Sequence, residues 1–150
     1  MIVAENRSIK HRNIVSKLYS FVPSEIGIAL EDFRGILEQH GVNLDGRLFF
    51  SMLSEPTAEV MTAELFMGIE EDAITVPPEE EVMFRSYFEI RNLHTIRLME
   101  DIDAQSQVAY WKLAEHVDTR GYHQTTPVFV EYKQSPQGGT YVEMSVGAVR

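Results

Sequence analysis

The same order of segments occurs twice along this sequence, and this internal repeat constrains the fold more than any other feature. In the first half, a β-rich run over residues 8–21 precedes a helical pattern from Pro23 to about Gln39, and "GRLFFSML" and "EVMTAELFMGI" follow as two strands. In the second half, a strand region within residues 84–99 precedes a helical pattern over about residues 103–117 and a second hairpin. The sequence therefore predicts two βαββ units.

A shift of 80 residues aligns the two halves without a gap. It pairs Gly41 with Gly121 after each helix and Pro56 with Pro136 in each turn, so the helix-ending glycine and the turn proline fall at the same step of each half. The other identities are Leu18 with Leu98, Ala29 with Ala109 and Phe49 with Phe129. A single unit would leave a small sheet half covered, whereas two joined units bury one core. We therefore predict an α+β fold, in which a tandem βαββ repeat forms an antiparallel sheet with two helices packed on it.

An acidic stretch with two prolines separates the predicted units. In "EEDAITVPPEEE", Pro77 and Pro78 cannot continue a helix or donate to a central ladder. We therefore expect a solvated linker over about residues 70–82, which joins units of about 8–70 and 83–150 within a single domain, 1–150.

Charge and composition exclude several classes of protein. The formal net charge of −10 argues against nucleic-acid binding, because a phosphate backbone must be met by clustered lysines and arginines, and it disfavours an anionic membrane surface in the same way. No apolar run approaches the roughly 20 residues that span a bilayer. The N-terminus carries no pattern of a secretion signal, and the sequence contains no cysteine. These features predict a cytoplasmic protein.

The last hairpin, "FVEYKQSPQGGTYVEM", allows its strand register to be predicted. If the chain reverses around Gln137, Val130 faces Met144 and Glu131 faces Glu143. One face is then apolar and should pack under a helix, while the opposite face carries Phe129, Glu131, Lys133, Tyr141, Glu143 and Ser145. This second face has two interpretations. It is either the solvated face of an antiparallel sheet or a receptor in which aromatic rings flank carboxylates to hold a cation.

Three further positions complete the candidate site. In the first unit, the matched hairpin is predicted to place Phe50 directly opposite Glu64, with Phe66 on the same face. On the second helix, Tyr110 and Trp111 are adjacent, so one of them should enter the core and the other is free to line a groove. For Trp111, core or boundary packing and a ligand platform are the two alternatives.

Two βαββ units in about 150 residues, a glycine after each helix, and the closing strands "AELFMGI" and "VEMSVGAV" resemble the GyrI-like effector-binding domains, which also occur at the C-terminus of some AraC-type and MerR-type regulators. The resemblance implies a groove where the two units meet, with aromatic residues and a buried glutamate for a small cationic or amphipathic ligand. It makes Glu64 and Glu143, in the two closing strands, the candidates for the ligand-facing acid. No helix-turn-helix precedes the domain, so we expect a stand-alone binder. Neither closing strand has the "P-V" ending common in the family, which leaves the subfamily open.

Sequence motifs give no support for catalysis or metal binding. The histidines at positions 11, 40, 94, 116 and 123 show no H-x-x-x-H or H-E-x-x-H spacing, and we find no nucleophile or phosphate-loop motif. We therefore expect no metal, cofactor or catalytic residue. The leading hypothesis is a non-enzymatic module for a small amphipathic or cationic ligand. The alternatives are a protein-interaction or accessory factor of a bacterial toxin or regulatory system, and a small hydrolase that uses Glu and Tyr. The predicted ligand-binding residues are Glu64, Glu143, Phe50, Phe129, Tyr141, Glu131 and Trp111.

Overall fold

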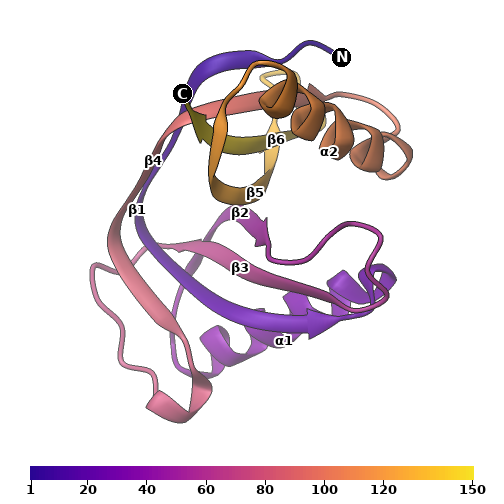
Figure 1. The fold of residues 1–150 in the computed structure, drawn as a ribbon. Coiled ribbons are helices and arrows are strands. Elements are labelled where there is room, and N and C mark those ends of the chain that lie inside the picture. Colours follow the sequence, from indigo (N-terminus) through magenta and orange to yellow (C-terminus); the bar gives the residue numbers. More distant parts are fainter. The chain divides into compact units, whose positions relative to one another are not determined.

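The computed structural model describes residues 1–150 and shows the predicted order of elements twice (Figure 1). The α+β class and the tandem βαββ order are thereby confirmed. The first repeat consists of β1 (Ala4–Phe21), a short 3-10 helix η1 (Pro23–Glu25), α1 (Ile26–Gln39), β2 (Leu44–Met52) and β3 (Met61–Ile69). The second consists of η2 (Pro78–Glu80), β4 (Met83–Leu98), α2 (Ile102–Thr119), β5 (His123–Gln134) and β6 (Thr140–Val149). Neither helix is long and apolar enough to cross a membrane.

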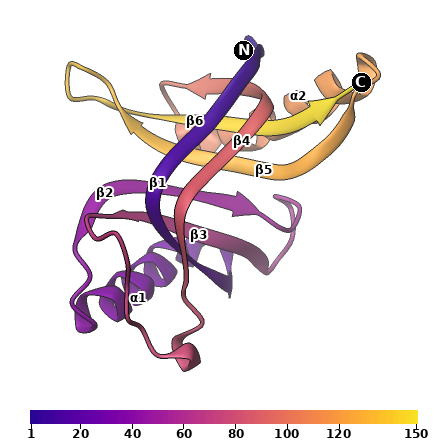
Figure 2. The same ribbon diagram turned by 90° about the vertical axis from the view of Figure 1, so that its left-hand side faces the viewer.

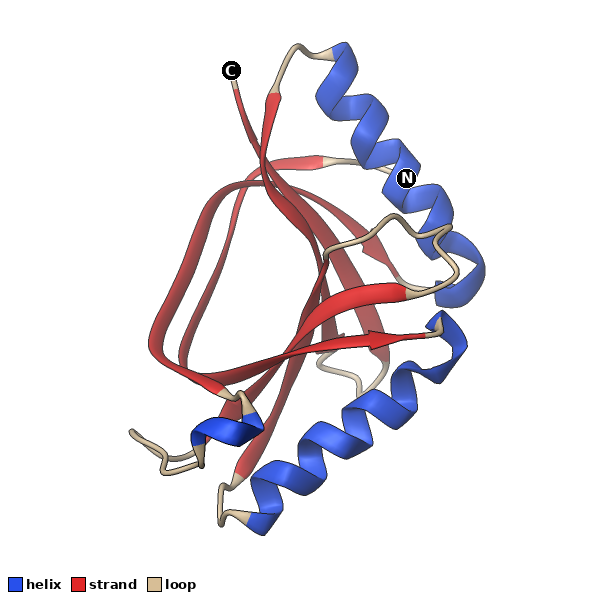
Figure 3. Ribbon diagram, turned by 60° about the horizontal axis from the view of Figure 1, so that its bottom comes forward, coloured by secondary structure: helices blue, strands red, loops and turns tan.

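The chain forms two compact units. The α1 unit is Lys10–Phe88, and the α2 unit combines Met1–Ile9 with Glu89–Arg150. The long strands β1 and β4, which Figure 2 shows along their whole length, therefore each contribute residues to both units. Each unit contains one long helix and a sheet of its own strands (Figure 3).

In the α1 unit, β3 is the central strand and pairs antiparallel with both β1 and β2. Helix α1 buries its apolar stripe of Ala29, Phe33 and Leu37 at the four-residue spacing that places side chains on one helix face. The ring of Phe33 lies 6.2 Å from the ring of Tyr19 on β1. The helix that was predicted after Pro23 therefore packs against this sheet.

In the α2 unit, β6 is the central strand between β4 and β5, and its register with β5 is the predicted one. Val130 pairs with Met144, and Glu131 pairs with Glu143. The five-residue connection 135–139 is tight, because the backbone N–H of Ser135 donates to the carbonyl of Gly139 and that of Gly138 donates to the carbonyl of Ser135. Helix α2 buries Ala109 and Leu113 and contacts both strands of this hairpin, which confirms that the hairpin packs under a helix.

The register of β2 with β3 differs from the predicted one by one residue. Glu64 pairs with Ser51, and Phe50 pairs with Leu65 on the other face of the sheet. The prediction that Phe50 opposes Glu64 is therefore wrong. The connection over residues 53–60 is too long to act as a tight turn, so the proline in it did not define where the chain reverses.

The repeat is present in the structure, but its shift is not constant. Gly41 and Gly121, 80 residues apart, both end a helix in the left-handed conformation, with φ of 75° and 70°. In contrast, Leu18 pairs with Glu64 just as Arg97 pairs with Glu143, so β1 matches β4, and β3 matches β6, with a shift of 79 residues. The gapless alignment is therefore wrong at Leu18 and Leu98, which are 62% and 3% exposed. The second repeat has one more residue before its helix and one fewer in its hairpin connection.

Candidate functional site

The two predicted ligand-facing acids occupy equivalent positions in the central strands of their units. Glu64 lies on β3 in the α1 unit, and Glu143 lies on β6 in the α2 unit. Each carboxylate pairs with an arginine of β4, which is Arg85 for Glu64 and Arg97 for Glu143. The two sites are nevertheless built differently around this shared pair.

The site around Glu64, which we call the Glu64 cage, consists of Ser16, Glu64, Phe66, Arg85 and Phe88. The Ser16 hydroxyl donates to Glu64 Oε2 at 2.6 Å, and Arg85 Nη1 donates to Ser16 Oγ at 2.8 Å and to Glu64 Oε2 at 3.3 Å. The Glu64 side chain is 23% exposed and that of Arg85 is 30% exposed. The carboxylate is thus largely withdrawn from water, and two side chains contact its Oε2 atom.

Aromatic rings form the rest of the Glu64 cage. The guanidinium carbon of Arg85 lies 5.6 Å from the ring centre of Phe66 and 5.8 Å from that of Phe88. The two rings are 5.3 Å apart, and Phe66 stacks on Phe49 at 4.5 Å with only 7° between the planes. A cation within about 6 Å of a ring centre is attracted by the ring quadrupole. The cage therefore combines a carboxylate with two π faces around one cationic group.

The site around Glu143, the Glu143 cluster, gathers several charges. Lys133 Nζ lies 2.7 Å from Glu143 Oε1 and 3.8 Å from Glu131 Oε1. On the other oxygen, Arg97 Nη2 lies at 3.2 Å and Arg7 Nη2 at 3.9 Å. Glu131 and Glu143 are only 7% and 4% exposed. The interpretation of this face as solvated is therefore wrong for both glutamates.

The surrounding cations set the protonation of this cluster. Burial acts to raise the pKa of Glu143, but the hydrogen bond and charge of Lys133, followed by those of Arg97, hold it below the ordinary value. Burial acts to lower the pKa of Lys133, but its hydrogen bond to Glu143 and the charges of Glu131 and Glu143 raise it. Both groups are therefore ionised at neutral pH, and the cluster is held together by opposite charges.

The remaining predicted site residues are distributed over both units. Phe129 is 4% exposed, and the guanidinium carbon of Arg97 lies 4.8 Å from the ring centre of Tyr141. Phe50 is 6% exposed, on the face opposite Glu64. Trp111 is 47% exposed and meets Tyr110 edge to face at 5.1 Å, so it is not a core residue. Tyr141 thus joins the Glu143 cluster through Arg97, whereas Phe50 lies on the other sheet face from Glu64 and Trp111 is exposed on α2.

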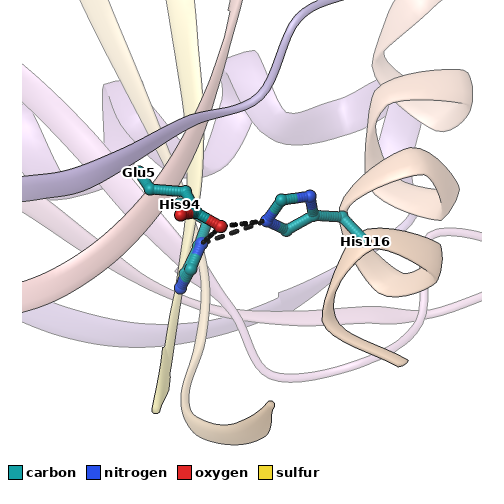
Figure 4. A group of neighbouring side chains, drawn as sticks. All are labelled: Glu5, His94 and His116. Atoms are coloured by element: carbon teal, nitrogen blue, oxygen red, sulfur yellow. Dashed lines mark hydrogen bonds and ion pairs between the residues drawn. The ribbon is translucent and has the colours of Figure 1, made fainter. Parts of the chain in front are cut away.

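A further group of side chains, absent from the predicted site, meets in the α2 unit (Figure 4). Glu5 on β1, His94 on β4 and His116 on α2 point toward one another. His116 Nε2 lies 3.1 Å from Glu5 Oε1 and 3.2 Å from His94 Nδ1, and His94 Nδ1 lies 3.6 Å from Glu5 Oε1. The histidine side chains are 5% and 9% exposed. Motif spacing did not reveal this group, because its members come from three different elements rather than from one short segment.

The neighbours of this group shift its protonation equilibria. The Tyr122 hydroxyl donates to Glu5 Oε1 at 3.1 Å, and Arg120 Nη1 lies 3.6 Å from the same oxygen. Burial acts to raise the pKa of Glu5, but the Tyr122 hydrogen bond and the charge of Arg120 lower it overall. Burial first, and then the charges of Arg120 and His94, lower the pKa of His116. Two cavities adjoin the group, one of about 350 Å³ lined by His116 and Arg120 and one of about 250 Å³ lined by Glu5, His94 and Tyr122.

Comparison with known proteins identifies the family of the chain. Residues 10–148 match the family model described as "Domain of unknown function (DUF5085)". The chain belongs to this family. No curated protein sequence matches this DUF5085 member.

Two solved structures share the fold of this DUF5085 member. One is EcmrR in a structure described as the EcmrR–DNA complex in EcmrR-RPo, with a TM-score of 0.74 and 15% identity over 99% of this chain. This chain spans 57% of the length of that EcmrR chain. The other is the EcmrR C-terminal domain, with a TM-score of 0.66 and 12% identity, which covers 100% of this chain and 99% of that domain. At these identities the comparison establishes the shared fold alone.

Proposed function

We propose that this protein is a non-enzymatic binding module that takes up a small organic cation at the Glu64 cage. The observation that carries the proposal is the position of the Arg85 guanidinium, which lies against two phenylalanine rings while it pairs with a partly buried carboxylate. This combination of π faces and one carboxylate is the recognition chemistry of lipophilic cations.

In this proposal, Arg85 occupies the place of the ligand's cationic group and must move for the ligand to bind. The Arg85 side chain is 30% exposed, so water is available to hydrate its guanidinium once it leaves. Ser16 keeps its hydrogen bond to Glu64 throughout and holds the carboxylate in place. The exchange replaces one cation by another, so the net charge of the cage does not change. Phe66, which is 2% exposed, then packs against the apolar part of the ligand.

Two comparisons support the same class of function. The sequence resembles effector-binding domains in which a closing-strand glutamate faces the ligand, and Glu64 lies in such a strand. The fold is shared with the C-terminal domain of EcmrR, a protein whose complex with DNA has been solved. The alternatives of a protein-interaction factor and of a small hydrolase stay predictions.

Thermal-shift and calorimetric titrations with a series of aromatic quaternary ammonium compounds test the proposal. Neutral analogues of the same shape serve as ligand controls. We expect the cations, and not the neutral analogues, to stabilise the wild type. Glu64→Gln should weaken binding at least about 10-fold, because it removes the charge that compensates the buried cation. Arg85→Met should strengthen binding, because the ligand no longer competes with the guanidinium.

The matched control is Glu143→Gln, which removes the equivalent carboxylate of the other unit and should leave cation affinity unchanged. Each ligand-induced shift is measured against the same variant without ligand, so differences in intrinsic stability do not enter. The proposal is refuted if no cation stabilises either the wild type or Arg85→Met, or if Glu64→Gln binds cations as tightly as the wild type.

A further inference from the structure

We propose that Glu5, His94 and His116 form a binding site for a divalent transition-metal ion of the zinc class. The site lies within the α2 unit and shares no residue with the Glu64 cage, so the proposal goes beyond the ligand-binding function. Two imidazoles and one carboxylate are a ligand set that Zn²⁺ adopts in proteins when it keeps a further position open.

The spacing of the three ligand atoms matches tetrahedral coordination. Glu5 Oε1, His94 Nδ1 and His116 Nε2 form a triangle with sides of 3.1, 3.2 and 3.6 Å. With metal–ligand bonds of about 2.0–2.1 Å, two ligands of a tetrahedral ion are about 3.4 Å apart. An ion can therefore enter without a change of backbone, because the side chains already stand at nearly the required separations.

Outer hydrogen bonds orient two of the three ligands for this role. His94 Nε2 lies 3.1 Å from the backbone carbonyl oxygen of Ala148, so this nitrogen carries the proton and Nδ1 presents its lone pair to the group. A metal-bound histidine commonly donates its other ring N–H to a carbonyl in this way. On the carboxylate, the Tyr122 hydroxyl donates to Oε1 and restricts the rotation of the Glu5 side chain.

Hydrogen bonds of His116 account for two sides of this triangle, but not for the side between His94 and Glu5. His94 Nδ1, as an unprotonated nitrogen, and Glu5 Oε1 are both acceptors, yet they lie 3.6 Å apart. A proton on His116 Nε2 can be donated to His94 or to Glu5, and Tyr122 and Arg120 contact Glu5 from another side, but none of these contacts joins His94 Nδ1 directly to Glu5 Oε1. A cation at the centre of the triangle attracts all three atoms at once.

The charge of the group and its access to solvent favour an open coordination position. Two neutral imidazoles and one carboxylate leave a divalent ion with a single net positive charge, which suits water or an anionic group as a further ligand. His116 lines the cavity of about 350 Å³, and Glu5 and His94 line that of about 250 Å³. Arg120, the cation nearest to Glu5, is 57% exposed and is able to turn into solvent when the ion enters.

Titration of chelator-treated protein with Zn²⁺ by calorimetry, and with Co²⁺ by visible absorption, tests the site. We expect one ion per chain, a tetrahedral type of Co²⁺ spectrum, and a higher unfolding temperature with Zn²⁺. Each of His116→Gln and Glu5→Gln should lower the affinity for the ion by more than about 100-fold. Each variant removes a side chain that binds the metal directly, and not merely a residue that orients a ligand. Glu5 is one-third exposed, so Glu5→Gln keeps the fold testable even if His116→Gln unfolds.

The control variant is His40→Gln, which removes a histidine of the α1 unit and should leave the affinity and the spectrum unchanged. Glu64→Gln should likewise bind Zn²⁺ as the wild type does, which separates this test from that of the Glu64 cage. The proposal is overturned if the wild type binds no ion, if Glu5→Gln binds as tightly as the wild type, or if His40→Gln alone abolishes binding.

Discussion

Replacing Lys133 by methionine tests how the α2 unit tolerates two facing carboxylates. Lys133 Nζ contacts Glu143 at 2.7 Å and Glu131 at 3.8 Å, and methionine keeps most of its length but not its charge. Removing one partner of a fully buried ion pair costs about 3–5 kcal/mol. The Lys133 side chain is 38% exposed, and Arg97 and Arg7 remain beside Glu143, so screening reduces the expected loss to about 2 kcal/mol. This loss lowers the unfolding temperature by about 4–8 °C.

The loss should depend on pH in a defined direction. The pKa of Glu143 lies below its ordinary value in the folded protein, so its ionised form stabilises the fold above the pKa of the unfolded chain, and this stabilisation is lost as the pH falls through the folded pKa. Without Lys133, the folded pKa of Glu143 moves up, and protonation relieves the repulsion between Glu131 and Glu143. The difference in stability between wild type and Lys133→Met is therefore largest at neutral pH and closes as the pH falls through the lowered pKa of Glu143 in the folded protein.

Urea and thermal denaturation from pH 7.5 down to pH 3.5 measure this difference. Lys112→Met, which removes an exposed lysine of α2, is the control for net charge and should cost little at any pH. Adding Glu131→Gln to Lys133→Met should restore at least half of the lost stability at pH 7, because one of the facing charges is then gone. The reasoning is refuted if Lys133→Met is as stable as the wild type at pH 7, or if its deficit is the same at every pH.

Two further predictions concern the fold. Leu113→Ala, at a position 1% exposed on α2, should cost about 3 kcal/mol, whereas Trp111→Ala, at a position 47% exposed, should cost less than about 1 kcal/mol; equal losses in urea denaturation would contradict the helix orientation. Gly121→Ala, at φ of +70°, should cost about 1–2 kcal/mol. Gly35→Ala in α1, where an added Cβ meets nothing, should stabilise the protein by about 0.5–1 kcal/mol; a Gly121→Ala variant of unchanged melting temperature would show that this helix end relaxes.

The sequence predicted what local patterns encode. The helices, the glycines that end them and the register of the last hairpin follow from periodicity and from a tight turn, and the structure confirms each of them. The β2–β3 register was missed by one residue, because an eight-residue connection leaves two registers equally compatible with the loop. The alternation of side chains along a strand also placed Glu131 and Glu143 on one face of the sheet. This pattern carries no information on what covers that face, so the burial of both glutamates was not predicted.

The cluster of Glu5, His94 and His116 shows a different limit of sequence reasoning. Metal motifs are recognised by short spacing along one element, whereas these residues come from two strands and a helix. Only the fold of the α2 unit, which combines residues 1–9 with residues 89–150, brings them within 4.8 Å of one another. A helical His116 two turns after the buried Ala109 was a weak signal, because the same position also suits a histidine that interacts with the helix dipole.

The charges around the two equivalent glutamates decide which of them is the better receptor for a cation. On one neighbouring strand, Glu64 pairs with Ser51, whereas Glu143 pairs with Glu131. On the other neighbouring strand, Glu64 pairs with Leu18, whereas Glu143 pairs with Arg97. A cation that approaches Glu64 therefore competes with Arg85 alone, whereas at Glu143 it meets Lys133, Arg97 and Arg7. With both of its glutamates counted, the Glu143 cluster still carries a net positive charge, which repels a further cation. These charges support the proposal that Glu64, rather than Glu143, is the acid that meets a cationic ligand.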